Sequence, residues 1–390
     1  MNTHTPPLRI ALICDWFRPR VGGIEIHLQG LAEGLTRAGH EPHVITATPG
    51  PATDYPFPVH RLAVPVTERF GFVYTPAPFI QIQALLRRLA FDVVHCHSSI
   101  LSPLTYGSLY LAKRLGLPAV MTCHSVLKYY WGLFLVADRL WGWSRWPVLF
   151  SAVSPTAAAF LEKAGRMAAV HILPNAVHSD RWRLPEVQKD PDEILLVSVM
   201  RLSIRKRGHT LIRLLPELLR QCPPNRRLHL TIVGDGTQKP RLERLVRRLG
   251  LQGVVDLPGV LDQTVIAALF ARSDIFVLPA NQEAFGVAAL EARSAGLPVV
   301  GMGRSALSHF IRHGVEGLLA ADDGELGKHL LSLIHDDESR RHIARHNRTT
   351  ATEWTWESAI SRHLELYAQA RQERDRFNGQ RLCRIRGNEP

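Results

Sequence analysis

Short apolar runs alternate with helical patterns along this chain, and the alternation starts again near its middle. In the first half the runs cover residues 10–14, 44–46, 93–96, 119–122 and 149–153. In the second half they cover residues 194–199, 228–233, 254–257, 275–278 and 298–300. Strands that alternate with helices in this way form parallel sheets. The sequence therefore predicts an α/β protein with two Rossmann-like domains in tandem, joined at about residues 180–192.

The closing segment of the chain has the spacing of one helix face, with Ile360, Leu364 and Tyr367 as its apolar positions. Beyond it the residues are polar and basic, and we expect a loose tail. We expect the closing helix to pack back toward the first domain. The predicted first domain, second domain, closing helix and tail cover residues 1–183, 184–356, 357–376 and 377–390.

The composition supports two domains and restricts the setting. A hydrophobic content of 46% over 390 residues is enough for a core in each domain. No apolar stretch approaches the roughly 18 residues that cross a bilayer, so no transmembrane helix is expected. The run at 8–14 leads into Asp15 instead of a small-residue cleavage site, which indicates a strand and not a signal peptide. Five scattered cysteines fit neither a disulfide framework nor a zinc motif, and they favour the cytoplasm.

The chain carries a formal charge of +12, and residues 201–250 supply most of it with 13 basic and 3 acidic side chains. Such a field attracts nucleotide diphosphates, anionic lipid or nucleic acid. The alternative is a solvated helix face, carried by Arg241, Arg244, Arg247 and Arg248.

A glycine pair follows the first apolar run, in the stretch Asp15-Trp16-Phe17-Arg18-Pro19-Arg20-Val21-Gly22-Gly23, before a helix that we expect to begin at Ile24. Paired glycines let the backbone approach a ligand and leave the first helical N–H groups free for an anion. A tight turn is the alternative. The third glycine of a dinucleotide-binding fingerprint is missing, which argues against a nicotinamide oxidoreductase.

Two glutamates, Glu283 and Glu291, follow the apolar run at 275–278. If residues 285–295 are helical, the two carboxylates lie near one face, just over two turns apart. The N–H groups of Phe285, Gly286 and Val287 would then meet an anion, and Glu291 would accept hydrogen bonds from ribose hydroxyls. A capping carboxylate and a surface glutamate are the alternative.

A run of cations, Arg201, Arg205, Lys206 and Arg207, follows the run at 194–199 and precedes a helix. Cations beside a helix start can hold a diphosphate and neutralise its charge as it leaves, so no metal is required. The Asp-x-Asp motif at 190–192 lies in the expected linker and indicates a turn.

Histidines follow two strands of the first domain. His124 follows the run at 119–122, where it can donate to a sugar hydroxyl or a phosphate. His95 and His97 flank Cys96, but no further ligand has matching spacing, so no metal site is predicted.

Aromatic and basic residues interleave between Tyr129 and Trp146, where four of the eight tryptophans fall. Lys128, Arg139 and Arg145 accompany them. This pattern is typical of segments at a membrane interface, and an ordinary core helix is the alternative.

With these motifs the chain resembles glycosyltransferase family 4, the retaining GT-B enzymes. Within that family it is most similar to the catalytic subunit of phosphatidylinositol N-acetylglucosaminyltransferase and to the phosphatidylinositol mannosyltransferases. The likeness extends from about Leu8 to Tyr367. The motifs that carry it lie at residues 15–25, 95–99, 122–125, 201–206 and 283–291.

The resemblance implies a GT-B fold, in which two Rossmann-like domains face each other across a cleft. The first domain would bind the acceptor and the second the nucleotide-sugar. The resemblance implies that His124 contacts the donor sugar, that Arg201 and Lys206 hold the diphosphate, and that Glu283 lies beside the transferred sugar and Glu291 at the ribose. The implied donor-binding residues are Gly22, Gly23, Val260, Leu261, Phe285, Gly286, Val287 and Glu291.

Three positions depart from the family pattern. Arg207 occupies the place of a usual glycine. His178 ends the hinge element at 174–178, where relatives have Asp. The stretch at 305–309 replaces Gly-Gly-x-Pro-Glu. These departures concern the identity of the donor and the hinge more than the reaction.

The sequence and the resemblance together predict transfer of a hexose or N-acetylhexosamine from a UDP- or GDP-sugar to a lipid hydroxyl, such as that of a phosphoinositide. We expect no cofactor, no metal and no nucleic acid partner. Arg18 and Arg20 are the expected acceptor-binding residues, and the expected location is the cytoplasm, on an anionic inner membrane face. A soluble acceptor, such as inositol phosphate or a polysaccharide, and a non-catalytic nucleotide-binding protein are the alternatives.

Overall fold

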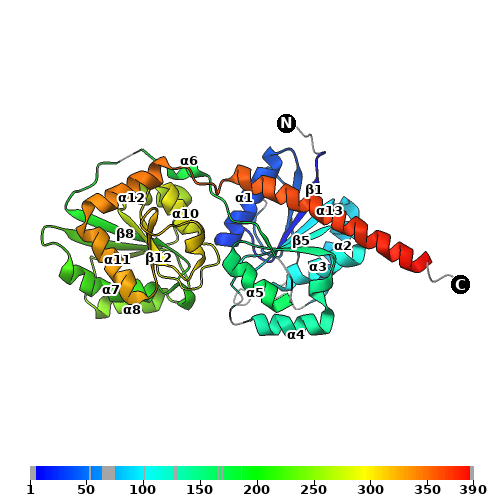
Figure 1. Ribbon diagram of the computed structural model, residues 1–390, viewed down its shortest axis with the longest axis horizontal. Coiled ribbons are helices and arrows are strands. Elements are labelled where there is room, and N and C mark those ends of the chain that lie inside the picture. The colour runs from blue at the N-terminus through cyan, green and yellow to red at the C-terminus, as the bar shows by residue number, and fades with distance from the viewer. Residues whose placement is uncertain are drawn as a thin grey trace. The chain divides into compact units, whose positions relative to one another are not determined.

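The structure is a computed structural model, and the residues that it describes are 6–51, 54–63, 75–100, 102–126, 128, 130–165, 167, 170–185 and 187–386, without the side chains of 379–386. The chain forms two compact units (Figure 1). Unit 1 comprises Met1–Ala176 and Trp356–Pro390, and unit 2 comprises Val177–Thr355. The boundary falls at Ala176, inside the expected hinge element and not at the expected residue 183.

Unit 1 is built on a parallel sheet, which has seven strands over the described residues, in the order β3-β2-β1-β4-β5-β6-β7. Its strands are β1 (Arg9–Cys14), β2 (Glu41–Thr46), β3 (Val59–Arg61), β4 (Val93–Ser98), β5 (Ala119–Cys123), β6 (Val148–Ala152) and β7 (His171–Ile172). Its helices are α1 (Gly23–Arg37), α2 (Ala77–Leu89), α3 (Pro103–Leu115), α4 (Trp131–Trp141), the 3-10 helix η1 (Trp143–Arg145), α5 (Pro155–Gly165) and α13 (Trp356–Arg386).

Unit 2 repeats the design with a parallel sheet of six strands, counted in the described part of the chain, in the order β10-β9-β8-β11-β12-β13. Its strands are β8 (Glu193–Val199), β9 (Arg227–Val233), β10 (Val255–Gly259), β11 (Ile275–Leu278), β12 (Val299–Met302) and β13 (Gly317–Ala320). Its helices are α6 (Ser179–Trp182), η2 (Ile204–Lys206), α7 (Gly208–Gln221), α8 (Lys239–Arg248), α9 (Gln263–Arg272), α10 (Val287–Ser294), η3 (Ala306–His309), α11 (Asp323–His335) and α12 (Asp337–Thr349).

Both sheets have the doubly wound strand order, which confirms the prediction of two Rossmann-like domains. In such a sheet the order reverses at a switch point, and ligands bind outside the carboxyl ends of the strands there. The switch point lies between β1 and β4 in unit 1 and between β8 and β11 in unit 2. The glycine pair follows β1, and the cation run and Glu283 follow β8 and β11. The candidate residues of each unit therefore lie where this fold binds ligands.

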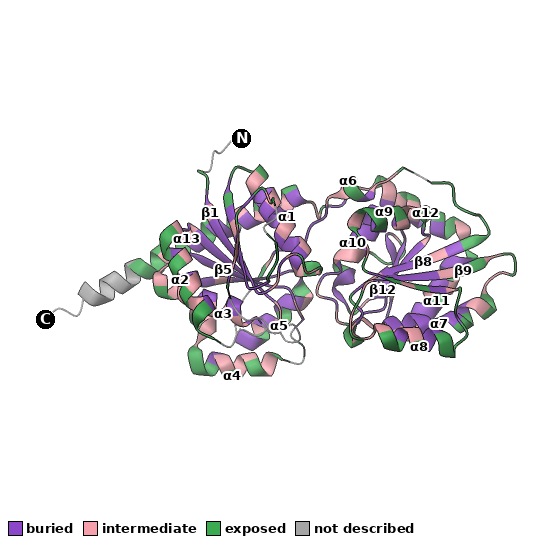
Figure 2. Ribbon diagram, turned by 180° about the vertical axis from the view of Figure 1, so that it is seen from behind, coloured by how far each residue is buried: buried purple, intermediate pink, exposed green. Residues whose placement is uncertain are grey.

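The central strands of each sheet are buried on both faces, as Figure 2 shows for the interior of each unit. In β1 the side chains of Ile10 and Leu12 belong to one core cluster, and those of Ala11 and Ile13 belong to another. The two-residue period of a strand sends successive side chains to opposite faces, so each face of this sheet has its own core. Continuous apolar runs are the expected sequence pattern for such strands.

The chain returns to unit 1 through α13, which packs against α1. A Cβ atom added at Gly30 would come within 2.2 Å of the Trp356 ring. The absence of a side chain at Gly30 therefore lets the ring pack against α1. The buried side of α13 also carries Ile360, His363 and Tyr367. The helix continues to Arg386, so residues 377–386, expected as a loose tail, are helical. Good helix formers predominate there, and Gly379 is the only glycine in that stretch.

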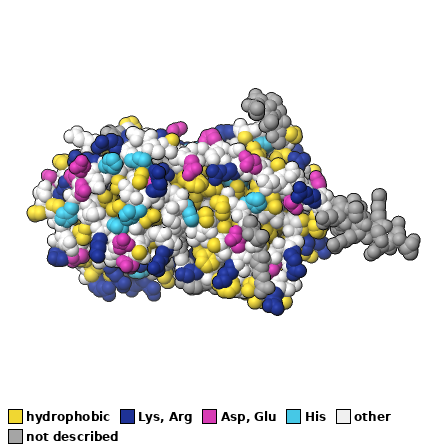
Figure 3. Space-filling view, in the orientation of Figure 1, with side chains coloured by type: hydrophobic (Ala, Val, Ile, Leu, Met, Phe, Trp, Pro, Cys, Tyr) yellow, Lys and Arg dark blue, Asp and Glu magenta, His cyan; other side chains and the backbone are white. Residues whose placement is uncertain are grey.

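The basic helix α8 has a solvated face. Arg241, Arg244, Arg247 and Arg248 are exposed, and Leu242 and its apolar neighbours are buried. Figure 3 shows Lys and Arg side chains gathered over the end of unit 2 that contains α7 and α8. Among the described helices, none has the length and apolarity needed to span a bilayer.

Candidate functional site

Lys206 and Glu283 meet at the switch point of unit 2. Lys206 ends η2 after β8, and Glu283 follows β11, so neighbouring strands of one sheet deliver the two side chains. The Lys206 ammonium donates to the Glu283 carboxylate. The lysine side chain is 27% exposed and the glutamate side chain 11% exposed. The pair is thus open enough for Lys206 to turn toward an anion.

Helix α10 begins beside this pair. Gly286 is its N-cap residue, with φ of 93° and no side-chain cap. The helix starts at Val287, two residues later than expected, so Glu283 lies in the loop before the helix and not on its face. A glycine is required because the backbone is left-handed and because a Cβ atom would lie 2.7 Å from Leu307. The first N–H groups of an uncapped helix attract an anion.

Glu291 lies in the second turn of α10, with 7% of its surface exposed. Burial raises the pKa of its carboxyl to about 8. No hydrogen bond to its carboxylate is present within the described residues. A buried carboxylate without donors is costly, and hydroxyl donors from a ligand would relieve that cost.

Arg207 takes a left-handed conformation with φ of 58°, as the N-cap of α7. This explains why a glycine is usual here, because L-residues adopt this conformation at a cost. The Arg207 guanidinium donates to the Pro279 carbonyl at 3.0 Å and to Asp323 at 2.6 Å. The contacts of Arg207 are thus with other parts of unit 2. Two neighbours in the cation run differ in this respect: Lys206 pairs with Glu283, and Arg207 holds the start of α7 to Pro279 and Asp323.

The other donor-binding candidates of unit 2 lie at the same edge of the sheet. Arg201 is exposed just beyond β8, and Val260, which is 57% exposed, and Leu261 follow β10.

Asp190 and Asp192 form a turn in which the Asp190 carboxylate accepts the Asp192 N–H at 2.9 Å. The turn prediction for the Asp-x-Asp motif is confirmed.

The glycine pair of unit 1 leaves open space. Gly22 is the N-cap of α1 in extended backbone, and α1 begins at Gly23, one residue before the expected Ile24. A Cβ atom at Gly23 would meet nothing within 4 Å. Packing inside unit 1 therefore does not require a glycine at position 23.

Asp15, ahead of the glycine pair, has a structural role. Its carboxylate accepts hydrogen bonds from the Leu104 N–H at 3.1 Å and from the Thr105 hydroxyl at 2.7 Å. These bonds hold the start of α3 against β1. Burial raises the pKa of Asp15 to about 6, and the same hydrogen bonds oppose that rise.

Arg18 and Arg20 lie in the loop between Asp15 and the glycine pair. Arg18 donates to Gln29 at 3.0 Å. Arg20 stacks on Trp16, 3.8 Å from the ring centroid, and pairs with the buried Glu25 at 3.3 Å. Both side chains are half-buried. Their contacts with α1 and with Trp16 hold the two guanidinium groups beside this loop.

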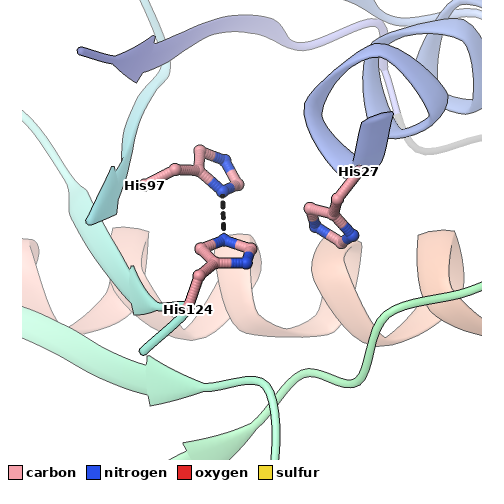
Figure 4. A group of neighbouring side chains, drawn as sticks. All are labelled: His27, His97 and His124. Atoms are coloured by element: carbon pink, nitrogen blue, oxygen red, sulfur yellow. Dashed lines mark hydrogen bonds between the residues drawn. The ribbon is translucent and has the colours of Figure 1, made fainter. Parts of the chain in front are cut away.

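Histidines cluster at the carboxyl ends of β4 and β5, where His97 is the last but one residue of β4 and His124 follows β5 (Figure 4). His97 Nδ1 and His124 Nε2 lie 3.0 Å apart. The His27 ring faces them from α1, with 5.0 Å between the ring centroids of His27 and His124. Burial lowers the pKa of His124 to about 3, and burial together with the neighbouring histidines holds the pKa of His27 and His97 well below the ordinary value. These imidazoles are neutral at pH 7, so His124 can donate or accept one hydrogen bond without a charge.

The same three histidines offer nitrogen ligands within 4.8 Å of one another. A tetrahedral zinc ion needs its nitrogen ligands about 3.4 Å apart, so the rings would have to close in to hold one. The sequence offers no third ligand with matching spacing, and the structure brings His27 to His97 and His124 from a helix distant in sequence. His27 and His363 lie on the buried faces of α1 and α13, and single histidines on apolar faces carry no signal in the sequence.

Two family models match the chain in succession. The model of Glycosyltransferase Family 4 matches residues 21–181, and the model of Glycosyl transferases group 1 matches residues 180–350. The two models together cover residues 21–350, so the chain is built of these two glycosyltransferase domains. The matches include the glycine pair and the histidines in the first model, and Lys206, Glu283 and Glu291 in the second.

The relatives of this glycosyltransferase carry names of different activities. One phosphatidylinositol N-acetylglucosaminyltransferase subunit, from Arabidopsis thaliana, is 28% identical over 76% of the chain and 67% of its own length. The chain spans 61% of the human protein of the same name, with 28% identity over 75% of the chain. Glycogen synthase of Mycobacterium tuberculosis is 26% identical over 92% of the chain and 94% of its own length. The structure of Anabaena HepE in complex with UDP and glucose superimposes with a TM-score of 0.73 at 21% identity, covering 93% of this chain and all of that one.

The glycosyltransferase also exposes an apolar face on α4. Leu133, Val136, Leu140 and Trp141 are 55–68% exposed and lie along one side of the helix. Arg139 and Arg145 are exposed beside them. Tyr129, the first residue of the aromatic segment, lies outside the described residues. A helix that is apolar on its solvent side is typical of an interaction surface.

Proposed function

We propose that this glycosyltransferase moves a hexose or an N-acetylhexosamine from a UDP- or GDP-sugar to a hydroxyl of a membrane lipid, such as a phosphoinositide, with retention at the anomeric carbon. The observation that carries the proposal is the contact between Lys206 and Glu283 beside the uncapped start of α10. A cation, free N–H groups and a carboxylate together match a phosphate that is joined to a sugar.

In this proposal Arg201 and Lys206 neutralise the diphosphate as it leaves. The N–H groups at Phe285, Gly286 and Val287 contact its oxygens, and Glu291 accepts from the ribose. Charge that develops on the leaving group is stabilised by groups that are already in place.

The transferred sugar is oriented by Glu283 and His124, and the departing β-phosphate helps to deprotonate the acceptor hydroxyl. Glu283 binds sugar hydroxyls and does not act as a covalent nucleophile. The nucleotide base is bound near Val260 and Leu261, largely through the backbone, and the diphosphate also approaches the glycine pair, Gly22 and Gly23. The solved structure with UDP and glucose supports a nucleotide-sugar donor.

A lipid acceptor is supported by the named activity of the Arabidopsis relative and by α4. An apolar helix face bordered by arginines binds the interface of an anionic bilayer. We therefore place the enzyme peripherally on the cytoplasmic, inner face of a membrane, with Arg18 and Arg20 binding the acceptor phosphate. No nucleic acid partner is proposed.

A soluble acceptor is the second candidate. The match to a glycogen synthase over nearly the full length of both chains favours a polysaccharide, and the two loop arginines would equally suit inositol phosphate. A non-catalytic nucleotide-binding protein would need the Lys206–Glu283 pair only for binding.

A donor screen by mass spectrometry tests the proposal. The full chain is incubated with UDP- and GDP-sugars and a lipid extract, with inositol phosphate and polysaccharide in parallel, and the anomeric configuration of the product is determined by NMR. The proposal predicts a glycolipid with the anomeric configuration of the donor. Products only on the soluble acceptors would favour the second candidate, and an inverted anomer would contradict retention.

Metal removal checks the proposed absence of a cofactor. Because Arg201 and Lys206 neutralise the diphosphate, we expect dialysis against a chelator to leave turnover unchanged. Loss of turnover that zinc or magnesium restores would show that a metal, for example at the three histidines, takes part.

A further inference from the structure

A cavity of about 230 Å³ lies behind α4 in unit 1. Phe134, Ala137 and Trp141 line it from the helix, and Leu109 and Met121 line it from α3 and β5. Its lining is almost wholly apolar. Two tryptophans also line it: the indole N–H of Trp143 donates to the Phe134 carbonyl at 3.1 Å, and that of Trp146 is buried without a partner among the described residues.

The cavity is partly open to the surface, since its lining residue Trp141 is largely exposed. Transfer of apolar surface from water into an apolar pocket is favourable. The cavity therefore suits a hydrocarbon chain that enters from outside.

The outer surface of the same helix indicates the source of that ligand. Trp141 lines the cavity and is also 68% exposed, so it lies at the border between the cavity and the apolar outer face of α4. Arg139 and Arg145 are exposed there. The acidic residue next to Arg139, Asp138, is buried, and its carboxylate accepts from the Ser144 N–H at 2.8 Å. The arginines thus complement anionic lipid headgroups.

The cavity reaches the carboxyl ends of β4 and β5, where Ser98 and Cys123 line it. Successive residues of a strand point to opposite faces, and the chain neighbours His97 and His124 lie against His27 of α1. The cavity and the histidines therefore lie on opposite faces of the sheet, at the same edge.

We propose that this cavity binds one hydrocarbon chain of the lipid acceptor, which enters beside Trp141 from the apolar face of α4. This inference rests on the proposed function, since it concerns the acceptor of the same reaction. It adds a physical basis for selecting a lipid over a free headgroup, because only the lipid has a hydrocarbon chain whose burial removes apolar surface from water.

Photolabelling tests the inference. The probe is phosphatidylinositol with a diazirine at the end of one acyl chain, in phosphatidylcholine vesicles, and labelled peptides are mapped by mass spectrometry. Ala137→Phe fills the cavity from α4. Val136→Phe, at the neighbouring exposed position, adds the same ring outside it. We expect wild type and Val136→Phe to be labelled at cavity residues, and Ala137→Phe to lose at least about tenfold of that labelling, equivalent to 1.4 kcal/mol.

Equal labelling of Ala137→Phe and wild type, or labelling confined to the exposed face of α4, would overturn the inference. A competition with the wild-type chain does not depend on the folding of a variant: lysophosphatidylinositol should compete with the probe, and glycerophosphoinositol should not. Competition by both or by neither would also overturn it. The labelling needs no donor, so a failure of the proposed function appears separately, as wild type that is labelled in the cavity but transfers no sugar to lipid.

Discussion

Two glycines of α1 are glycines for different reasons. Gly30 accommodates the Trp356 ring, which an added Cβ atom would meet at 2.2 Å. Gly23 has no such neighbour within 4 Å. At the residue scale, this contrast separates a glycine that serves packing from one that leaves room for a ligand.

Substitution of each glycine by alanine checks the distinction. Gly30→Ala should destabilise the protein by about 1–3 kcal/mol, because the core must shift to admit the methyl group. Gly23→Ala should leave the free energy of unfolding within about 0.5 kcal/mol of wild type and raise the KM for the nucleotide-sugar. Urea unfolding and steady-state kinetics measure the two effects. An unchanged KM for Gly23→Ala would remove this glycine from the donor site.

In the proposed donor site, Glu291 would link donor binding to proton release. Its folded-state pKa of about 8 means that the carboxyl is largely protonated at pH 7. Ribose hydroxyls that donate to the ionised carboxylate would lower that pKa, so UDP binding at pH 7 should release up to about one proton. Calorimetry in buffers of different ionisation enthalpy measures the release, and Glu291→Gln should abolish it. Release that is unchanged in Glu291→Gln would assign it to another group.

The same shift sets the sign of a pH effect on stability. Because the folded pKa lies above the unfolded one, the folded state binds more protons between about pH 4.5 and 8. The contribution of Glu291 therefore disfavours the fold increasingly as pH rises through this window, and it levels off above it. Glu291→Gln should lose this part of the pH dependence, which urea unfolding across the same pH range measures.

At the scale of elements, α4 is the part whose surface most needs an explanation. Leu140, on the apolar side of α4, is 68% exposed. Ile80 on α2 is 65% exposed, and α2 carries no other exposed large apolar side chain. Leu140→Glu should weaken binding to anionic vesicles at least about tenfold, whereas Ile80→Glu should not, because a charge in the bilayer interface is costly. Flotation with anionic and neutral vesicles measures both. Equal loss for the two variants, or no preference for anionic vesicles, would remove α4 as the membrane surface.

The elements that the sequence could predict are those with long apolar runs. Each of the ten runs overlaps a strand of the structure. The unpredicted strands β3 and β7 have two or three half-exposed or exposed residues and no distinct apolar run. The third unpredicted strand, β13, does lie in a short apolar run, at residues 318–321, which was not predicted to be a strand. The closing helix was predicted from its apolar spacing, but its end was not, since polarity alone does not stop a helix.

At the scale of the whole molecule, two sheets with one strand order give each unit its own switch point. Residues just after predicted strands could therefore be assigned to these edges from the sequence, and the meeting of Lys206 with Glu283 bears out that logic. His27 could not be assigned, because its partners are fixed only by how α1 packs on the sheet. The cavity behind α4 could not be predicted either, because a void depends on how side chains from several elements fail to fill a space.

Turnover of the nucleotide-sugar by Glu283→Gln tests the central claim most directly. The substitution keeps the shape of the side chain and removes the charge that pairs with Lys206, and Glu338→Gln on the exposed start of α12 is the matched control. We predict that Glu283→Gln folds as wild type and loses about 10²-fold or more in kcat, while the control keeps wild-type turnover. Wild-type kcat in a folded Glu283→Gln protein would contradict the account.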